Sequence, residues 1–212
     1  MKKEIIIVGA GDVGKFVAHQ IDNFGVYTVR GFLDDDKVKH GTNICGYKVL
    51  GGIDYVSNLH ENLNLVVAIA NPIVKSKVLK VLSAYQNIVY PTLIHPKSWI
   101  DKSVIIGSGC IIYPGVAINY ETRLDDFVIV NMNATIGHNC CLRRFSTISP
   151  GVNLGGFTNV GLMSFIGIGA NTLQSIFIGE QCTIGGGTMV IDNIPHKSTV
   201  VGNPGRVINI KK

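Results

Sequence analysis

Aliphatic residues recur at every sixth position through the second half of the chain. From Ile94 to Val190, sixteen of the seventeen positions at this spacing are Ile, Leu or Val, and Thr172 is the exception. Small or β-branched residues occupy most positions four places after each aliphatic, and glycine often follows it directly. A period of six does not match a helix, and it is typical of a solenoid of short strands and tight turns. A β-sandwich would need this unbroken spacing to arise by chance.

The pattern therefore predicts a left-handed parallel β-helix over residues 91–212, ending in a C-terminal tail. Three hexapeptides would form each triangular coil, with the aliphatic side chains stacked inside and the small residues at the corners. Three cysteines, Cys110, Cys140 and Cys182, occupy the small inward phase, that is, the position four residues after each aliphatic. A thiol there behaves as a small buried apolar group. Cys141 falls on the neighbouring, outward phase.

The first 90 residues have a different pattern, in which apolar runs alternate with amphipathic segments. This alternation predicts an α/β domain of the half-Rossmann type over residues 1–90. The expected strands cover residues 4–8, 26–33 and 65–70, and the expected helices cover residues 15–24 and 74–85.

A glycine-rich turn, Gly9–Gly14, joins the first expected strand to the first expected helix and reads GxGxxG. Such a turn brings backbone N–H groups close to a phosphate. An acid 20 residues past Gly14, Asp34, stands where a carboxylate accepts hydrogen bonds from a ribose, and Asp35 adjoins it. The candidate substrate contacts are Gly11, Asp12, Val13, Asp34 and Asp35. NAD binding by a regulatory protein, binding of a mononucleotide, and glycines that serve only strand–helix packing all remain open, although a domain of this size suits a mononucleotide better.

Composition narrows the class of partner. Hydrophobic residues make up 46% and charged residues 16% of the 212 residues, which excludes general disorder. The formal charge of +5 suits an anionic small molecule, and the chain lacks the basic, aromatic-interleaved runs of a nucleic-acid-binding protein. There is no uninterrupted apolar run of membrane-spanning length, no signal-peptide pattern and no cluster with metal-ligand spacing. An odd number of cysteines without a CxxC pair favours the cytoplasm.

The chain resembles the sugar acyltransferases of the sialic acid O-acetyltransferase and bacillosamine N-acetyltransferase type. The resemblance rests on IIIVGAG, GFLDDD and GYKVLGGID in the first domain, and on the hexapeptide array, IGHNC, ISPGVNLGG and VVGNPGRVI in the second. It implies a homotrimer in which the triangular β-helices form three neighbouring prisms, with acetyl-CoA in the groove between two of them. It also implies a nucleotide-linked amino sugar held by the N-terminal domain.

The resemblance places the family's catalytic histidine on His138, as general base toward an amine or hydroxyl acceptor. Asn139 stands where the family has an acid, and an amide can orient an imidazole but cannot stabilise its cation as a carboxylate does. Thr147 stands where a second histidine is common. Gly11-Asp12-Val13 replaces a Gly-Gly-His turn, which bears on the sugar contacts. From the repeat alone, His138 could equally be a surface turn residue.

For acetyl-CoA, the repeat suggests backbone groups that share the hexapeptide position of His138 and so line a groove along a prism edge. The candidates are Gly156, Ile168 and Gly186, with Thr147 near the thioester and Arg206 near the adenosine phosphates. Arg206 could instead be a solvated terminal charge. We expect N-acetylation of a nucleotide-linked amino sugar; sugar O-acetylation and a non-catalytic trimeric scaffold are the alternatives, the latter motivated by Asn139 and Thr147.

Overall fold

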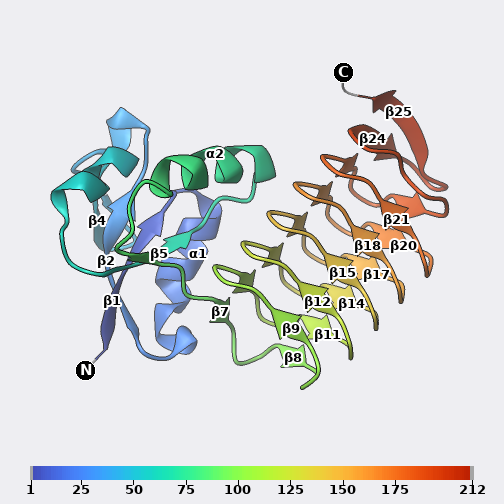
Figure 1. The fold of residues 1–212 in the computed structure, drawn as a ribbon, viewed down its shortest axis with the longest axis horizontal. Coiled ribbons are helices and arrows are strands. Elements are labelled where there is room, and N and C mark those ends of the chain that lie inside the picture. Colours follow the sequence, from blue (N-terminus) through green and yellow to red (C-terminus); the bar gives the residue numbers. More distant parts are fainter. Residues whose placement is uncertain (1, 211–212) are drawn as a thin grey trace. The chain divides into compact units, whose positions relative to one another are not determined.

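The computed structural model describes residues 2–210, and the chain divides into two compact units, Met1–Thr92 and Leu93–Lys212. The first unit is an α/β domain around one sheet, and the second is a stack of triangular coils (Figure 1). We describe each unit by itself.

The first unit contains a six-stranded sheet in the order β3-β4-β2-β1-β5-β6. All neighbouring strands run parallel except β3 and β4, which pair antiparallel. Residues 5–8 of the central strand β1 are at most 2% exposed, as expected of an apolar run buried on both faces. The strands are β1 Lys3–Val8, β2 Tyr27–Leu33, β3 Asn43–Ile44, β4 Tyr47–Gly51, β5 Leu63–Val67 and β6 Ile88–Val89.

Two α-helices follow β1 and β5, namely α1 Asp12–Gln20 and α2 Pro72–Leu82, and three short 3-10 helices cover Ile21–Phe24, Lys37–Lys39 and Ile53–Asn58. Helix α1 begins at Asp12, earlier than expected, so that Gly14 lies inside it. Only glycine fits at that position, because a Cβ there would overlap the carbonyl oxygen of Gly9. Helix α2 also begins earlier, because Asn71 caps it by accepting hydrogen bonds from Ile73 N and Val74 N at 3.0 and 3.1 Å.

The sheet is larger than the three strands expected from the apolar runs. Strand β4 pairs parallel with β2, and β6 pairs parallel with β5. Both are peripheral strands with mixed burial, so neither produces a continuous apolar run. From β1 the chain adds β2 and β4 on one side, and it adds β5 and β6 on the other, so the topological switch point lies between β1 and β5. The loops after these two strands meet at the carboxyl edge of the sheet.

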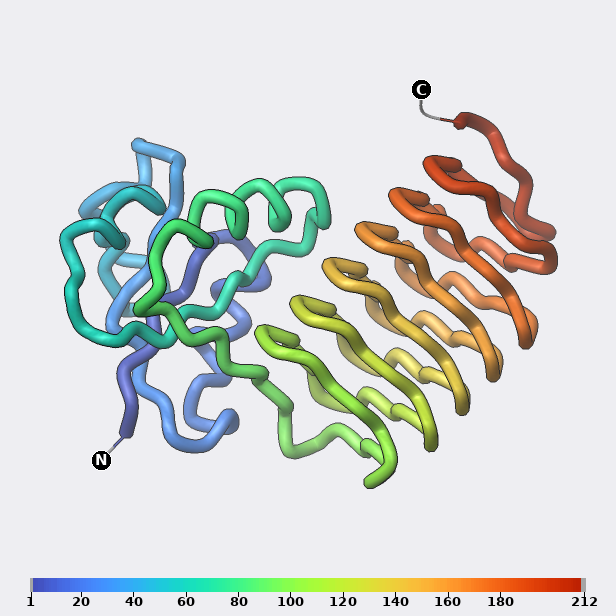
Figure 2. The backbone as a smooth tube through the Cα atoms, in the orientation of Figure 1, coloured from blue at the N-terminus to red at the C-terminus, as the bar shows by residue number. Residues whose placement is uncertain are grey.

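The second unit is a left-handed parallel β-helix, as the period of six predicts. Each turn of the backbone contributes one short strand to each of three parallel sheets, and Figure 2 shows the coils stacked in sequence. The first sheet contains β7 Leu93–Ile94, β10 Ile111–Ile112, β13 Ile129–Val130, β16 Thr147–Ile148, β19 Phe165–Ile166, β22 Thr183–Ile184, β24 Ser198–Val201 and β25 Arg206–Ile210. The second contains β8 Trp99–Ile100, β11 Ala117–Ile118, β14 Thr135–Ile136, β17 Asn153–Leu154, β20 Asn171–Thr172 and β23 Met189–Val190. The third contains β9 Ile105–Ile106, β12 Arg123–Leu124, β15 Cys141–Leu142, β18 Asn159–Val160 and β21 Phe177–Ile178.

The interior of the prism accommodates the one polar residue of the aliphatic series. Thr172 is 8% exposed, and its hydroxyl accepts a hydrogen bond from Gly155 N at 3.0 Å and lies 3.0 Å from Thr158 Oγ1. Because its hydroxyl is paired, Thr172 avoids most of the cost of burying a polar group. The three cysteines of the small inward phase, Cys110, Cys140 and Cys182, are at most 2% exposed, as predicted.

The C-terminal segment is more ordered than the expected tail. Strand β25 turns back and pairs antiparallel with β24, so that a hairpin ends the first sheet of the prism. The hairpin covers an edge that would otherwise present unpaired backbone groups.

Candidate active site

His138 stands in the turn that leads from β14 to β15. The turn is closed by Asn139, whose backbone is left-handed with a φ of 56°. Gly137, which precedes the histidine, has no room for a side chain, since a Cβ there would lie 2.6 Å from Gly156 N. The repeat thus fixes the backbone on both sides of His138.

Aromatic rings hold the imidazole of His138 from two directions. Tyr120, one coil earlier, stacks on it with ring centroids 5.0 Å apart and an interplanar angle of 10°. Phe157, one coil later, meets it edge-on at 5.0 Å and 85°. Gly156 lies against the ring: a Cβ there would be 2.8 Å from His138 Nε2 and 2.9 Å from Cε1. The absence of a side chain at Gly156 therefore determines where the imidazole can lie.

A short polar chain runs from the imidazole to a carboxylate. His138 Nδ1 lies 2.9 Å from Asn139 Oδ1, and Asn139 Nδ2 donates to Glu121 Oε2 at 2.7 Å. With Nδ1 donating to Asn139, Nε2 carries the lone pair, and among residues 2–210 it has no hydrogen-bond partner. An imidazole with one nitrogen anchored and the other free has the arrangement of a general base.

The other expected acetyl-CoA contacts lie on different parts of the prism. Ile168 and Gly186 adjoin each other in the turns after β19 and β22, since a Cβ on Gly186 would lie 3.1 Å from Ile168 Cγ2. His138 and Gly156 instead occupy the turns after β14 and β17. The expectation of one groove along one edge is therefore wrong within a single prism, because positions that share the hexapeptide phase can belong to different edges.

Thr147 and Arg206 are also separate from the imidazole. Thr147 belongs to β16 in the first sheet and is 2% exposed, whereas His138 connects the second and third sheets. Arg206 begins β25 and is exposed, and it donates to the carbonyl oxygen of Gly205 at 3.0 Å. The structure thus brings together His138, Asn139 and Gly156, and places the remaining candidates elsewhere on the unit.

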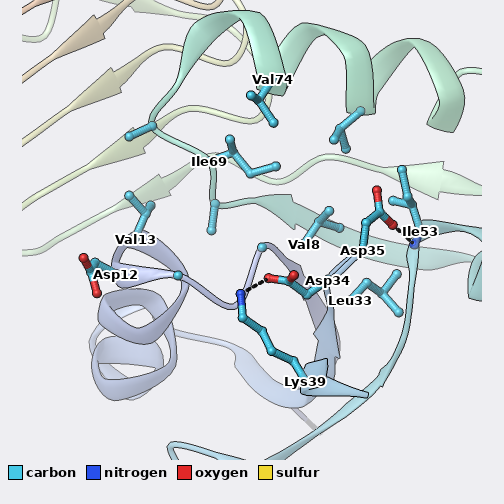
Figure 3. A pocket seen from close by; sticks show the side chains of 15 residues that line it. Val8, Asp12, Val13, Leu33, Asp34, Asp35, Lys39, Ile53, Ile69 and Val74 are labelled. Carbon is cyan, nitrogen blue, oxygen red and sulfur yellow. Dashed lines mark hydrogen bonds and ion pairs between the residues drawn. The ribbon is translucent and has the colours of Figure 1, made fainter. Parts of the chain in front are cut away.

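The first unit contains a cavity of about 420 Å³ at the carboxyl ends of its central strands. The loop after β1 and the loop after β5 form much of its wall, which is the position expected for a ligand in an open α/β sheet. All five expected contacts, Gly11, Asp12, Val13, Asp34 and Asp35, line it, together with Lys39, Ile53, Ile69 and Val74 among others (Figure 3).

Asp34 anchors the glycine-rich loop to the end of β2. Its Oδ2 pairs with Lys39 Nζ at 3.0 Å (Figure 3). The same oxygen accepts from Ala10 N at 2.8 Å, and Oδ1 accepts from Asp36 N at 3.0 Å. Burial opposes ionisation of Asp34, but these hydrogen bonds and Lys39 outweigh it and lower the pKa of the carboxyl. Since both oxygens are engaged by the protein, Asp34 is a weaker candidate for direct ribose contact than the sequence indicates.

Asp35 is the better placed of the two acids. Its Oδ1 accepts from Ile53 N at 2.9 Å, and its other oxygen points away from that bond (Figure 3). Gly52 leaves space for this carboxylate, because a Cβ there would lie 3.0 Å from Asp35 Oδ1. Asp35 thus retains an acceptor for a hydroxyl or N–H group in the cavity.

Sequence reasoning missed several residues of both sites. Tyr120, Glu121 and Phe157 surround the histidine turn, and Lys39 reaches the cavity from the 3-10 helix after β2. The signal for Glu121 was available, because it stands 18 residues before Asn139 and thus at the same position one coil earlier. Nothing local in the sequence marks Lys39, which reaches the cavity by pairing with Asp34.

Among residues 2–210, no group of three or more His, Cys, Asp or Glu side chains could hold a metal ion. Over the same range, no helix combines the length and apolar character needed to span a membrane.

Comparison with known proteins places this arrangement in a family. Residues 4–82 match the family described as PglD N-terminal domain. GDP-perosamine N-acetyltransferase of Escherichia coli O157:H7 is 30% identical over 181 residues, which cover 82% of this chain and 80% of that protein.

Solved structures match 98% of this chain. The acetyltransferase domain of PglB from Neisseria gonorrhoeae FA1090 superposes with a TM-score of 0.89 at 32% identity, covering 98% of this chain and 100% of that one, and a second structure of it contains acetyl coenzyme A. PerB from Caulobacter crescentus, in complex with CoA and GDP-perosamine, has a TM-score of 0.89 at 26% identity and covers 98% of both chains.

An α/β domain followed by a hexapeptide prism with a histidine turn defines an acyltransferase. Within that class, the chain belongs to the family of sugar N-acetyltransferases that includes GDP-perosamine N-acetyltransferase. The resemblance to bacillosamine-type enzymes is thereby confirmed.

Proposed function

We propose that this protein transfers the acetyl group of acetyl-CoA to the amine of a nucleotide-linked amino sugar, with His138 as general base. The observation that carries the proposal is the His138 imidazole, anchored at Nδ1 by Asn139 and free at Nε2. The family supports it, since a relative is a GDP-perosamine N-acetyltransferase and related structures contain acetyl coenzyme A, or CoA with GDP-perosamine.

The reaction needs no covalent enzyme intermediate. The neutral amine nitrogen attacks the thioester carbonyl carbon and forms the new C–N bond, while His138 Nε2 takes the proton that the nitrogen loses. The tetrahedral adduct then collapses, the C–S bond breaks, and the CoA sulfur leaves with the proton returned by His138. The products are an acetamido sugar and free CoA, and the imidazole is restored to its starting state.

The acetyl-CoA site is proposed to lie between two copies of the chain. Ile168 and Gly186 stand on a different prism edge from His138 and Gly156, so a groove that uses both sets requires a second prism. Exposed apolar side chains on the prism, including Ile168 at 63% and Phe157 at 54%, support contact with another copy. Such a groove requires at least a second copy, and the resemblance to sugar acyltransferases implies three, so we propose a homotrimer, which equilibrium sedimentation would detect as three times the mass of one chain.

The cavity of the first unit is proposed to hold the nucleotide. The first N–H groups of α1 have no acceptor within the helix, and they favour a phosphate next to Gly11, Asp12 and Val13. Asp35 offers a carboxylate oxygen to a ribose hydroxyl or to an N–H group of the base. Aliphatic groups such as Ile69 and Val74 line the same cavity and suit the face of a base. We place the reaction in the cytoplasm, the reducing compartment that the cysteine pattern favours.

The test is release of CoA thiol from acetyl-CoA in the presence of UDP-, GDP- and dTDP-linked amino sugars, with the product analysed by mass spectrometry and NMR. The proposal predicts thiol release with at least one amino sugar and an acetyl group on nitrogen. No turnover with any of these sugars, or acetylation on oxygen, would contradict it. Asp35→Asn should raise the KM for that sugar with little change in kcat, because Asp35 contacts the nucleotide and not the reacting atoms.

A further inference from the structure

The residue that follows His138 is an amide, Asn139, and a carboxylate, Glu121, stands one coil earlier within reach of it. Building on the proposed function, we propose that Glu121 is a positioning residue that acts on His138 through Asn139. The three residues form a chain of hydrogen bonds: His138 Nδ1 to Asn139 Oδ1 at 2.9 Å, and Asn139 Nδ2 to Glu121 Oε2 at 2.7 Å.

The coil repeat of the prism creates this chain. Ser103, Glu121 and Asn139 are separated by 18 residues each and occupy the same turn position in three successive coils. Glu121 N donates to Ser103 Oγ at 2.9 Å, and Ser103 Oγ donates to Asp101 Oδ1 at 2.6 Å. Glu121 and Asn139 both have left-handed backbones, with φ of 54° and 56°. The backbone thus holds the carboxylate of one coil over the amide of the next.

The chemistry of the amide fixes the donor and the acceptor of each hydrogen bond in this series. A carboxylate is an acceptor only, so Glu121 must face the NH₂ group of Asn139. The amide oxygen is then turned toward the histidine, where it accepts a hydrogen bond from the Nδ1–H group, and Nε2 is left as the basic nitrogen. Without Glu121, nothing in the described contacts prevents the amide from reversing and presenting its NH₂ group to Nδ1.

The charge of Glu121 adds a second effect. When His138 takes the proton of the acceptor amine it becomes a cation, and hydrogen bonds that end on a carboxylate favour the cation. Tyr120 and Phe157 contact the ring, and Glu121 reaches it through Asn139; none of these residues carries a positive charge. Glu121 is exposed, so solvent weakens its field and the expected effect is roughly 10-fold rather than the full contribution of the base.

The experiment moves the carboxylate between the two positions. Glu121→Gln keeps an acceptor oxygen but removes the charge, and it should lower kcat roughly 10-fold while KM for the sugar and for acetyl-CoA stays within about 2-fold. The double variant Glu121→Gln/Asn139→Asp puts a carboxylate directly on Nδ1 and should restore most of kcat. Asn139→Asp alone places two carboxylates at hydrogen-bond distance, and its kcat should be lower than that of the double variant.

The matched control is Glu180→Gln, an exposed glutamate on a different turn of the prism, which should keep wild-type kcat. The inference is overturned if Glu121→Gln has wild-type kcat, or if its loss is not repaired by the double variant, since a purely structural loss would not respond to the position of the charge. If His138→Ala also keeps full activity, the proposed function itself fails.

A spectroscopic measurement keeps the inference testable should a variant fold poorly or the acceptor sugar remain unknown. In wild-type protein labelled with ¹⁵N-histidine, the neutral His138 ring should carry its proton on Nδ1, with its signal assigned by loss in His138→Ala. A ring protonated on Nε2 would overturn the inference without bearing on whether the chain acetylates an amino sugar.

Discussion

Gly156→Ala tests whether the position of the imidazole limits the reaction. The new Cβ would lie 2.8 Å from His138 Nε2, 2.9 Å from Cε1 and 3.2 Å from Cδ2. Carbon–carbon contacts are favourable at about 3.5–4.0 Å, so the ring must move by roughly 0.5–1 Å. The backbone φ of Gly156 is not in the left-handed region, so alanine adds no backbone strain there.

The displaced atom is the nitrogen that takes the proton. A misplacement of about 1 Å lowers rates by about 10²-fold, and we expect kcat to fall roughly 10- to 100-fold with KM little changed. The loss of global stability should be small, about 1–2 kcal/mol, because a ring between Tyr120 and Phe157 can shift toward solvent.

Gly137→Ala is the matched comparison. Its Cβ would meet main-chain atoms of the next coil, at 2.6 Å from Gly156 N and 2.8 Å from Gly156 Cα, and these cannot move independently of the prism. It should therefore lower the free energy of unfolding more than Gly156→Ala does. Steady-state kinetics and urea unfolding of both variants decide the matter, and wild-type kcat in a folded Gly156→Ala protein would refute the claim that Gly156 positions the ring.

Three further predictions concern stability and reactivity. Asp34→Asn should lower the free energy of unfolding by about 2–3 kcal/mol at pH 7. Because the pKa of Asp34 is lowered in the folded protein, its ionised carboxylate stabilises the fold, and the difference from wild type in urea unfolding should shrink as the pH falls below the ordinary aspartate range. An equal difference at pH 3 would contradict this. Burial raises the pKa of Cys140 to about 11, so a thiol reagent at pH 8 should not modify Cys140 until urea unfolds the protein. The equally buried Cys110 and Cys182 should behave in the same way, and rapid labelling in the native state would show that the prism opens. Asn71→Ala removes the cap of α2 and should lower the free energy of unfolding by about 1 kcal/mol in thermal or urea melts, whereas an unchanged midpoint would show that the cap is dispensable.

The β-helix was predictable because its repeat is a property of local spacing. Each hexapeptide supplies one inward-pointing aliphatic residue and one tight corner, and three hexapeptides with this pattern make up each coil. Thr172 shows that the pattern tolerates one polar residue when the fold supplies partners for its hydroxyl. The strands β3, β4 and β6 were missed because peripheral strands of two to five residues lack a continuous apolar run.

The candidate site was only partly predictable, and the reason is geometric. The position of a residue within its hexapeptide determines where it lies in a turn. Its position within the 18-residue coil determines on which edge of the prism that turn lies. Gly156 follows His138 by one coil and adjoins it, whereas Ile168 follows by 30 residues and stands on another edge. Reading the sequence at a spacing of 18 would have paired Glu121 with Asn139. Which oxygens of Asp34 and Asp35 remain free depends on tertiary contacts, and no spacing rule shows it.

The central claim is that His138 is the base in acetyl transfer to an amino sugar. The most direct measurement is the rate of CoA thiol release from acetyl-CoA with the active nucleotide-linked amino sugar, compared between wild type and His138→Ala. His196→Ala, an exposed histidine in another prism turn, serves as the control. We expect a loss of kcat of about 10²-fold or more in His138→Ala only, and thiol release at the wild-type rate in a folded His138→Ala protein would contradict a role for His138 as the base.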